Sequence, residues 1–223
     1  MRKKFNPKTF IVVRTLANAL IISGVVFAFL GIWPYLSSEL NYRLSTLWQK
    51  PKVLGIQTVD SKPKGPDLPP LGVEPVDKNF GIIIEKILVN APVVPEVDPA
   101  LPKDYVTALK KGAAHAKGTA FPGSKGAKNN NVFIFAHSTL NPWDVPKYNA
   151  IFYLLRKLEV GDRITTFYQG KRYDYIVYDK KVVGAKDVRY LTEPSAEPVL
   201  TLQTCDPPGT QLRRLIITAN LVD

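Results

Sequence analysis

Three side chains of this sequence could together carry out acyl transfer: the only cysteine, one of the two histidines, and an arginine. Cys205 ends the run Thr-Leu-Gln-Thr-Cys, Arg214 follows nine positions later, and His137 directly follows an apolar run far upstream. A free thiol is mostly protonated at neutral pH, so an imidazole must remove its proton and later protonate the leaving group. A guanidinium stays charged and can stabilise the oxyanion of a tetrahedral intermediate. These residue types therefore indicate acyl transfer through a thioester.

Each of the three residues lies at an end of a predicted β-strand. The stretch Asp206-Pro-Pro-Gly is expected to end the strand before Cys205, and the chain then returns as another strand. Two strands joined by a loop would bring Cys205 and Arg214 to the same end of a sheet. His137 also lies at the end of a strand, so it could lie next to them. Adjacent strand residues point to opposite faces, so only one of Arg213 and Arg214 can reach such a site. The three strands are predicted at Val132–Ala136, Val199–Thr204 and Arg214–Val222.

The rest of the body is predicted to consist of short strands with few helices. β-Branched and apolar runs predict strands, and apolar residues at helical spacing predict short helices. His115 lies in a Gly-rich stretch that is expected to be loop, where it is expected to be a structural or rim residue. This pattern predicts an all-β fold with a closed or nearly closed barrel. The further strands are predicted at Gly81–Val89, Arg163–Tyr168 and Lys171–Val183, the helices at Asp104–Lys111 and Tyr148–Leu158, and the loop at Gly112–Lys128.

The amino-terminal part of the chain has the pattern of a membrane anchor. Thr15–Leu36 is apolar and uncharged, and it has about the 20 residues that cross a bilayer. Residues 1–14 hold five basic residues and no acidic one, which predicts a cytoplasmic tail and an extracytoplasmic body. A cleavable signal peptide is the alternative, but its apolar region is usually only about 7–15 residues long and precedes a small-residue cleavage site. An uncleaved single-pass transmembrane helix is therefore predicted.

Residues 37–78 separate the predicted anchor from the predicted catalytic body. Ser37–Lys50 has leucines at helical spacing, which fits either a juxtamembrane helix or an ordinary packed surface helix. From Pro51 to Lys78 the chain is rich in Pro, Gly and Lys, a composition typical of a stiff, extended stalk. The folded body is predicted to span residues 79–223.

The composition excludes some classes of protein. The chain has 30 basic and 19 acidic residues. Without the five basic residues of the tail, 25 basic residues remain against 19 acidic ones. Part of the positive charge therefore belongs to the targeting signal. No motif of basic and aromatic residues indicates binding to nucleic acid. With 45% hydrophobic residues the chain can build a core. A single cysteine cannot form an intramolecular disulfide, so the Cys205 thiol is either a reactive group or an inert part of the core.

Several of these segments resemble the sortases, which are membrane-anchored cysteine transpeptidases. Thr201–Cys205 matches the sortase pattern TLxTC, and the strand that opens with Arg214-Leu-Ile-Ile-Thr-Ala is similar to the arginine strand of the family. Phe135–Ser138 resembles the histidine segment, and the stretch from His115 to Gly123 is similar to the segment that precedes it. The resemblance covers approximately residues 79–223, and the predicted anchor agrees with it.

The resemblance assigns roles to individual residues of this chain. It implies that Cys205 is the nucleophile, His137 the acid and base, and Arg214 the group that stabilises the oxyanion or positions the substrate. Arg214 is preferred to Arg213 because it keeps the register of the family, and Arg213 is then a solvated edge residue or a rival for the same role. Substrate contacts are predicted for Thr204, Ala136, Ser138 and Arg213.

The resemblance also implies a substrate and an acceptor. The expected reaction cleaves a Leu-Pro-x-Thr-Gly-like sorting signal of a secreted protein after Thr, and passes the acyl group to an amine of a cell-wall precursor or a pilin lysine. The segment before the body lacks an aromatic lid motif, which favours a general-purpose sortase over a pilin-polymerising one. No cofactor or metal is expected; some sortases depend on calcium, but nothing in this sequence specifies a calcium site.

Two alternatives remain at this stage. The first is another extracytoplasmic cysteine acyltransferase of the L,D-transpeptidase type. Those enzymes place a small residue and Gly directly before the cysteine, whereas this chain has Gln203-Thr204 there. The second is a non-enzymatic, membrane-tethered β-domain in which the Cys205 thiol is buried and inert.

Overall fold

The computed structural model describes residues 7–48, 68–138 and 151–222 of the chain. The chain divides into two compact units, Met1–Asn41 and Tyr42–Asp223. Most of the predicted stalk, residues 49–67, and the first residues of the helix predicted at Tyr148–Leu158 lie outside the described part.

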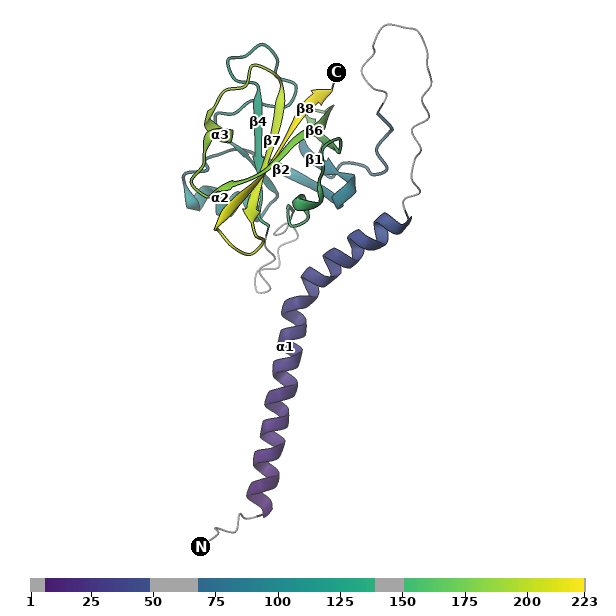
Figure 1. Ribbon diagram of the computed structural model, residues 1–223, viewed down its shortest axis with the longest axis vertical. Coiled ribbons are helices and arrows are strands. Elements are labelled where there is room, and N and C mark those ends of the chain that lie inside the picture. The colour runs from purple at the N-terminus through teal and green to yellow at the C-terminus, as the bar shows by residue number, and fades with distance from the viewer. Residues whose placement is uncertain (1–6, 49–67, 139–150, 223) are drawn as a thin grey trace. The chain divides into compact units, whose positions relative to one another are not determined.

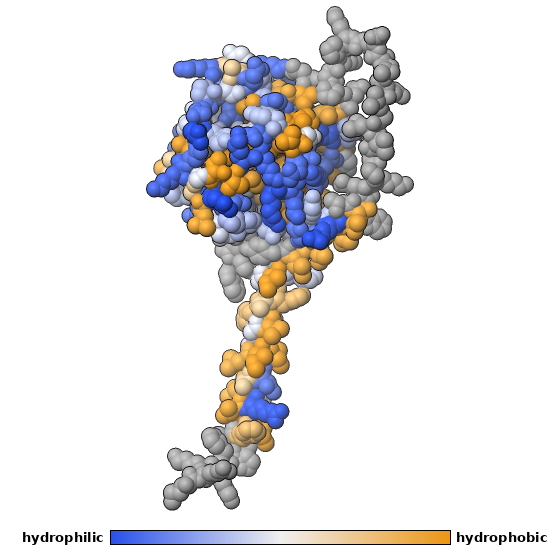
Figure 2. All heavy atoms as spheres, viewed as in Figure 1, coloured by the Kyte–Doolittle hydropathy of each residue, from blue (hydrophilic) through white to orange (hydrophobic). Residues whose placement is uncertain are grey.

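One long helix, α1 (Pro7–Trp48), contains both the predicted anchor and the segment that follows it. Its stretch Phe10–Trp33 is long and apolar enough to cross a membrane, and no other helix in the described ranges meets that condition. Figure 2 shows apolar side chains along much of this helix. These side chains lie on all sides of the helix and are exposed, whereas a surface helix of a water-soluble domain would have one polar face. The helix therefore suggests a membrane anchor.

The second unit contains a closed barrel of eight strands, in the order β1-β2-β3-β4-β7-β8-β6-β5, with β5 pairing back to β1 (Figure 1). Closure leaves no sheet edge without a partner strand. The predicted all-β fold with a closed barrel and few short helices is thus confirmed. The strands are β1 (Phe80–Ile84), β2 (Val89–Val97), β3 (Ala113–Ala116), β4 (Asn131–Phe135), β5 (Arg163–Tyr168), β6 (Lys171–Gly184), β7 (Val199–Asp206) and β8 (Arg213–Val222).

Two of the strand pairs are parallel, and both need a long connection. β2 and β3 are joined through α2 (Pro102–Leu109), while β4 and β7 are joined through the whole of β5 and β6. The other pairs are antiparallel, and β1–β2, β5–β6 and β7–β8 follow directly along the chain. Parallel strands cannot be joined by a tight turn, so each of these two pairs needs a crossover that contains other elements. The remaining short helices are η1 (Glu85–Ile87), η2 (Leu155–Lys157) and α3 (Arg189–Thr192).

The barrel is filled by aliphatic side chains from every strand. Ile82 of β1, Ile134 of β4 and Leu200 of β7 are fully buried, and Leu155 and Leu158 from the segment around η2 pack into the same core. Burying a side chain of this size stabilises the fold by about 1.5–3 kcal/mol. This core fixes how the ends of the strands lie relative to one another.

Four sequence-based assignments differ from the structure. Gly81–Val89 is divided into β1, η1 and the start of β2, because Leu88 takes a positive φ of 58° and reverses the chain. The predicted loop Gly112–Lys128 contains β3, whose alanines have a low strand propensity but are buried between β2 and β4. The described part of the predicted helix 148–158 forms turns and η2. Finally, β7 runs on through Cys205 to Asp206, because β8 pairs with it along that whole length.

A substitution at Gly112 tests the close contact at the start of β3. A Cβ atom there would lie 2.2 Å from the Pro92 carbonyl oxygen, so the backbone of β2 must shift. We expect Gly112→Ala to lower the free energy of unfolding by about 1–3 kcal/mol, measured by urea denaturation. Gly184→Ala is the matched control, because nothing lies within 4 Å of a Cβ atom at that position. Equal stability of the two variants would contradict this account.

Candidate active site

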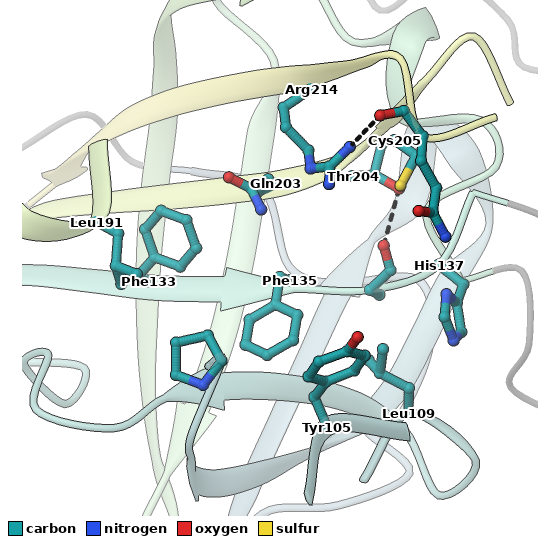
Figure 3. Close-up of a pocket in the computed structure, with 13 residues that line it drawn as sticks. Tyr105, Leu109, Phe133, Phe135, His137, Leu191, Gln203, Thr204, Cys205 and Arg214 are labelled. Carbon is teal, nitrogen blue, oxygen red and sulfur yellow. Dashed lines mark hydrogen bonds between the residues drawn. The ribbon is translucent and has the colours of Figure 1, made fainter. Parts of the chain in front are cut away.

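A pocket of about 250 Å³ lies over the parallel pair β4–β7. Figure 3 shows Cys205, His137 and Arg214 toward one end of this pocket, and Leu191 and Phe133 toward the other. Its walls are apolar along most of their length, with polar groups concentrated near Cys205. The lining residues are Pro99, Tyr105, Leu109, Phe133, Phe135, Ala136, His137, Leu191, Gln203, Thr204, Cys205, Gln211 and Arg214.

Strand pairing places Cys205 directly opposite Arg214. The two are Cα partners in the antiparallel pair β7–β8, and side chains of opposed residues lie on the same face of a sheet. Cys205 is a free cysteine and is half-buried, so its sulfur is neither bonded to another cysteine nor sealed in the core. An accessible thiol beside a guanidinium is the arrangement expected of a nucleophile rather than of a core residue.

The backbone of the β7–β8 loop holds the Arg214 guanidinium in the pocket. Its Nη1 donates hydrogen bonds to the carbonyl oxygens of Gln211, at 3.2 Å, and Arg213, at 3.0 Å. Figure 3 shows the Arg214 side chain extending over β7 next to Cys205. Because these bonds go to neutral carbonyls, the charge of the guanidinium is not neutralised by them. It therefore remains available to an anion that forms at Cys205.

Arg213 lies on the other face of the same strand. Its cross-strand partner is Asp206, and the two side chains form an ion pair of 2.9 Å between Nη2 and Oδ2. Arg213 does not line the pocket that contains Cys205 and Arg214. The expectation that only one of the two arginines reaches the pocket agrees with this placement, while the predicted substrate contact of Arg213 finds no support in the pocket lining.

His137 lies two residues beyond the end of β4 and lines the same pocket as Cys205. Its backbone is fixed by the Phe152 N–H, which donates to the His137 carbonyl oxygen at 3.2 Å. Partial burial lowers the pKa of the His137 imidazole below its usual value, because the charged form loses solvation. The ring is therefore neutral at pH 7 and can accept a proton. Catalytic hydrogen bonds often tighten only when substrate binds, so shared access to the pocket is the relevant geometry here.

A buried link joins the segment of His137 to the strand of Cys205. The Thr204 hydroxyl donates to the Ala136 carbonyl oxygen at 2.8 Å, and the Ala136 N–H donates to the Gln203 carbonyl oxygen at 3.2 Å. Thr204 is buried, so this hydroxyl is occupied within the protein. These bonds extend the β4–β7 pairing by one residue. They hold Ala136, which precedes His137, next to Thr204, which precedes Cys205.

Ser138 and His115 lie outside the pocket. Ser138 is buried and lines a narrow crevice next to it, which also includes Thr204, Cys205 and Asp206. Within the described ranges the Ser138 hydroxyl has no hydrogen-bond partner. His115 is a fully buried residue of β3.

Sequence reasoning missed most of the apolar wall of the pocket. Tyr105 and Leu109 come from α2, and Leu191 from α3, and nothing in the local sequence places them beside β4 and β7. A signal did exist for Phe133 and Phe135, because they alternate with the core residues Val132 and Ile134 on a strand that ends near His137. The described residues contain no group of three His, Cys, Asp or Glu that could hold a metal ion.

Comparisons with known proteins agree on one family. A family model described as a sortase domain matches residues 82–222. Sortase C-1 from Actinomyces oris is 26% identical, over 66% of this chain and 76% of that chain, with a TM-score of 0.54. A lid mutant of sortase A from Corynebacterium diphtheriae is 28% identical, over 66% of this chain and 71% of that chain, with a TM-score of 0.53. A pilus-related sortase C of Group B Streptococcus is 26% identical, over 67% and 70% of the two chains, with a TM-score of 0.53. No curated protein matches the sequence.

The link between Thr204 and Ala136 can be tested by removing one hydroxyl. Thr204→Val keeps the shape of the side chain but leaves the buried Ala136 carbonyl without this donor, so we expect a loss of about 1–3 kcal/mol in the free energy of unfolding. Thr204→Ser retains the donor and serves as the control, with the smaller loss expected from the missing methyl group. A Thr204→Val variant as stable as Thr204→Ser, in urea denaturation, would show that the link contributes nothing.

Proposed function

The chain belongs to the sortase family, and on that premise we propose that it cleaves a Leu-Pro-x-Thr-Gly-like sorting signal and transfers the new carboxyl end to an amine at the cell surface. As a member of this family it is a cysteine transpeptidase, so neither an L,D-transpeptidase-like enzyme nor a non-enzymatic β-domain describes it. One observation carries the assignment of roles: Cys205, His137 and Arg214, which come from three separate segments, line one pocket.

In the proposed first half-reaction, Cys205 attacks the threonine carbonyl of the signal. The sulfur forms a bond to the carbonyl carbon while its proton passes to the neutral imidazole of His137. The carbonyl oxygen becomes an oxyanion, which the Arg214 guanidinium beside Cys205 stabilises. The bond to the glycine nitrogen then breaks as His137 returns the proton to the departing amine, leaving a thioester on Cys205.

In the second half-reaction an acceptor amine replaces the departed glycine. Its nitrogen attacks the thioester carbon and gives a proton to His137, and the C–S bond breaks as the sulfur regains a proton. Water can compete for the same thioester, which would give hydrolysis instead of transfer. An amine of a cell-wall precursor or a pilin lysine is the proposed acceptor.

The apolar part of the pocket supports a substrate of this type. Tyr105, Phe135 and Leu191 offer surfaces for the leucine and proline side chains of a signal, on the side of Cys205 that the acyl part would occupy. An extended peptide advances about 3.3 Å per residue, so the residues before the scissile bond would lie along β7. The amide of Gln203, on the same face of β7 as Cys205, would supply a polar contact in this groove.

The proposed location is the outer face of the cell membrane. α1 suggests an anchor, and the five basic residues among the first fourteen residues support a cytoplasmic amino terminus. The barrel would then meet secreted proteins that carry carboxyl-terminal sorting signals. A general-purpose anchoring role, rather than pilus assembly, is part of the proposal and rests on the absence of an aromatic lid motif from the sequence before the barrel.

Single substitutions test the roles of the polar residues. We expect Cys205→Ala and His137→Ala to abolish cleavage of a fluorogenic Leu-Pro-x-Thr-Gly peptide, because each removes a group that forms or breaks bonds. Arg214→Ala should lower kcat by about 10²–10³-fold through loss of oxyanion stabilisation. Arg213→Ala is the matched control and should change kcat by less than about fivefold, since it breaks only an ion pair outside the pocket, in which the arginine side chain is 56% exposed. A severe effect of Arg213→Ala with a mild effect of Arg214→Ala would reverse the assignment.

The pH dependence of cleavage tests the state of His137. Burial lowers the pKa of its imidazole, so the neutral base persists as the pH falls past the usual histidine value. We therefore expect the acidic limb of kcat/KM to have its midpoint below about pH 6.5. The measurement is kcat/KM for the same peptide between pH 4.5 and 9. An acidic limb centred well above the usual histidine pKa would contradict a neutral, desolvated His137.

A further inference from the structure

The strand β2 contains a residue in an unfavourable backbone conformation, three residues before Pro99 of the pocket lining. Glu96 has a positive φ of 56°, and the pairing of β2 with β3 shifts register between Val94 and Val97 around it. A non-glycine residue in the left-handed region costs on the order of 1 kcal/mol and persists only where the surrounding structure imposes it. Glu96 therefore forms a bulge that some neighbouring group must hold.

That neighbouring group is the buried imidazole of His115. The Glu96 N–H donates to His115 Nδ1 at 3.3 Å, and His115 Nε2 lies 3.0 Å from the Ala120 carbonyl oxygen. A backbone N–H only donates and a carbonyl only accepts, so the ring is held as the neutral tautomer with its proton on Nε2. The same ring stacks on Phe121, with centroids 4.6 Å apart. His115 Nδ1 thus supplies the lone pair that accepts the Glu96 N–H at the bulge.

The bulge determines where one wall of the pocket begins. Directly after it, the Val97 carbonyl accepts a hydrogen bond from the Lys117 N–H at 2.9 Å, and Asp98 Oδ1 accepts one from the Ala100 N–H at 2.9 Å. This turn leads into α2. The segment from the turn through α2 supplies Pro99, Tyr105 and Leu109 to the pocket that contains Cys205.

A second contact connects His115 to β4, which lies under the pocket. The Thr119 hydroxyl lies 3.0 Å from His115 Nε2, donates to the Ala116 carbonyl at 2.7 Å, and accepts the Phe133 N–H at 3.3 Å. Phe133 belongs to β4 and lines the pocket. The imidazole is therefore hydrogen-bonded to the Glu96 bulge and, through Thr119, to β4, while it remains outside the pocket.

We propose that His115 is a positioning residue for the sorting-signal groove, and that its neutral form holds the Glu96 bulge from which the α2 wall extends. This inference rests on the proposed function, because the groove is assigned to the signal peptide there. Protonation would place a hydrogen on Nδ1, facing the Glu96 N–H, and would remove the acceptor. The bulge would then relax, the α2 wall would move, and peptide binding would weaken while the chemistry at Cys205 continued.

The surroundings of the His115 ring favour its neutral form. The Glu96 carboxylate lies 3.6 Å from Nδ1 and is the charged group that faces the ring from β2. Phe80 of β1 and Phe121 pack on the ring, and Tyr168 of β5 stacks on Phe121. Desolvation lowers the pKa of His115, and this effect outweighs the hydrogen bond to the Ala120 backbone and the attraction of Glu96, which both raise it. The neutral form is thus the native one at pH 7, and acid reduces its population.

The test measures kcat and KM for the fluorogenic signal peptide from pH 5 to 8 in matched variants. In the wild type, KM should rise toward acid pH. His115→Leu removes the acceptor and should raise KM by about tenfold at pH 7, the equivalent of one hydrogen bond of about 1.4 kcal/mol, with little change in kcat. His115→Asn offers an oxygen in place of Nδ1 and cannot titrate, so it should restore a low KM and abolish the rise at acid pH.

Two further variants distinguish an effect of the Glu96 bulge on KM from an effect of relieving backbone strain elsewhere in the barrel. Glu96→Gly accepts a positive φ without help, so it should make KM insensitive to pH and rescue the double variant with His115→Leu. Leu88→Gly relieves a similar φ of 58° at the β1–β2 turn and should leave KM unchanged. NMR of the wild type should show the Glu96 amide signal moving with the titration of His115.

The outcomes distinguish the two proposals. Absence of peptide cleavage by the wild type at any pH would overturn the proposed function, and this inference with it. Cleavage with a pH-independent KM, or with equal KM values for His115→Leu and wild type, would overturn the positioning role alone. If His115→Leu fails to fold, the comparison of His115→Asn and Glu96→Gly with wild type across pH decides the question by itself.

Discussion

The parallel pairing of β4 with β7 is the constraint on which the site depends. It places Phe135 beside Gln203, and the Thr204 hydroxyl and Ala136 N–H then extend the contact to the residues that precede Cys205 and His137. Nothing local in the chain joins these segments, because the strands are separated by the β5–β6 hairpin and by irregular connections. Cys205 and His137, the proposed nucleophile and base, lie far apart in sequence and are held at one end of one pocket by backbone hydrogen bonds and a single hydroxyl.

The register of β7 with β8 divides the charges near the thiol between two faces. Cys205 is opposite Arg214 on the pocket face, while Asp206 is opposite Arg213 on the other face. Because the Asp206 carboxylate is already paired with Arg213, it does not compete for Arg214. A shift of one residue in this register would place either Leu215, which is uncharged, or Arg213 opposite Cys205 in place of Arg214. Strand register is thus an electrostatic as well as a structural property of this site.

The apolar groove depends on elements outside the β4–β7 pair. Its walls include side chains from α2 and α3, and the path into α2 begins at the Glu96 bulge, which His115 holds. In the proposed function, peptide binding and the chemistry at Cys205 are therefore supported by different parts of the barrel. Such a division lets changes in the groove alter recognition of a signal while the bond-forming groups keep their positions.

The sequence by itself determined the types of chemistry and the elements that carry it. Each of these features depends only on residue types and their spacing within one segment, so it can be identified from the sequence alone. They are the TLQTC run, the histidine after an apolar strand, the arginine that follows, the apolar amino-terminal segment and most of the strands. Only the tertiary structure decided which strands pair, that the alanines at 113–116 form β3, that Thr204 bonds to Ala136, and that α2 forms a wall beside Cys205. These features arise from contacts between residues distant in the chain, whose energies depend on register and close packing that no single segment encodes.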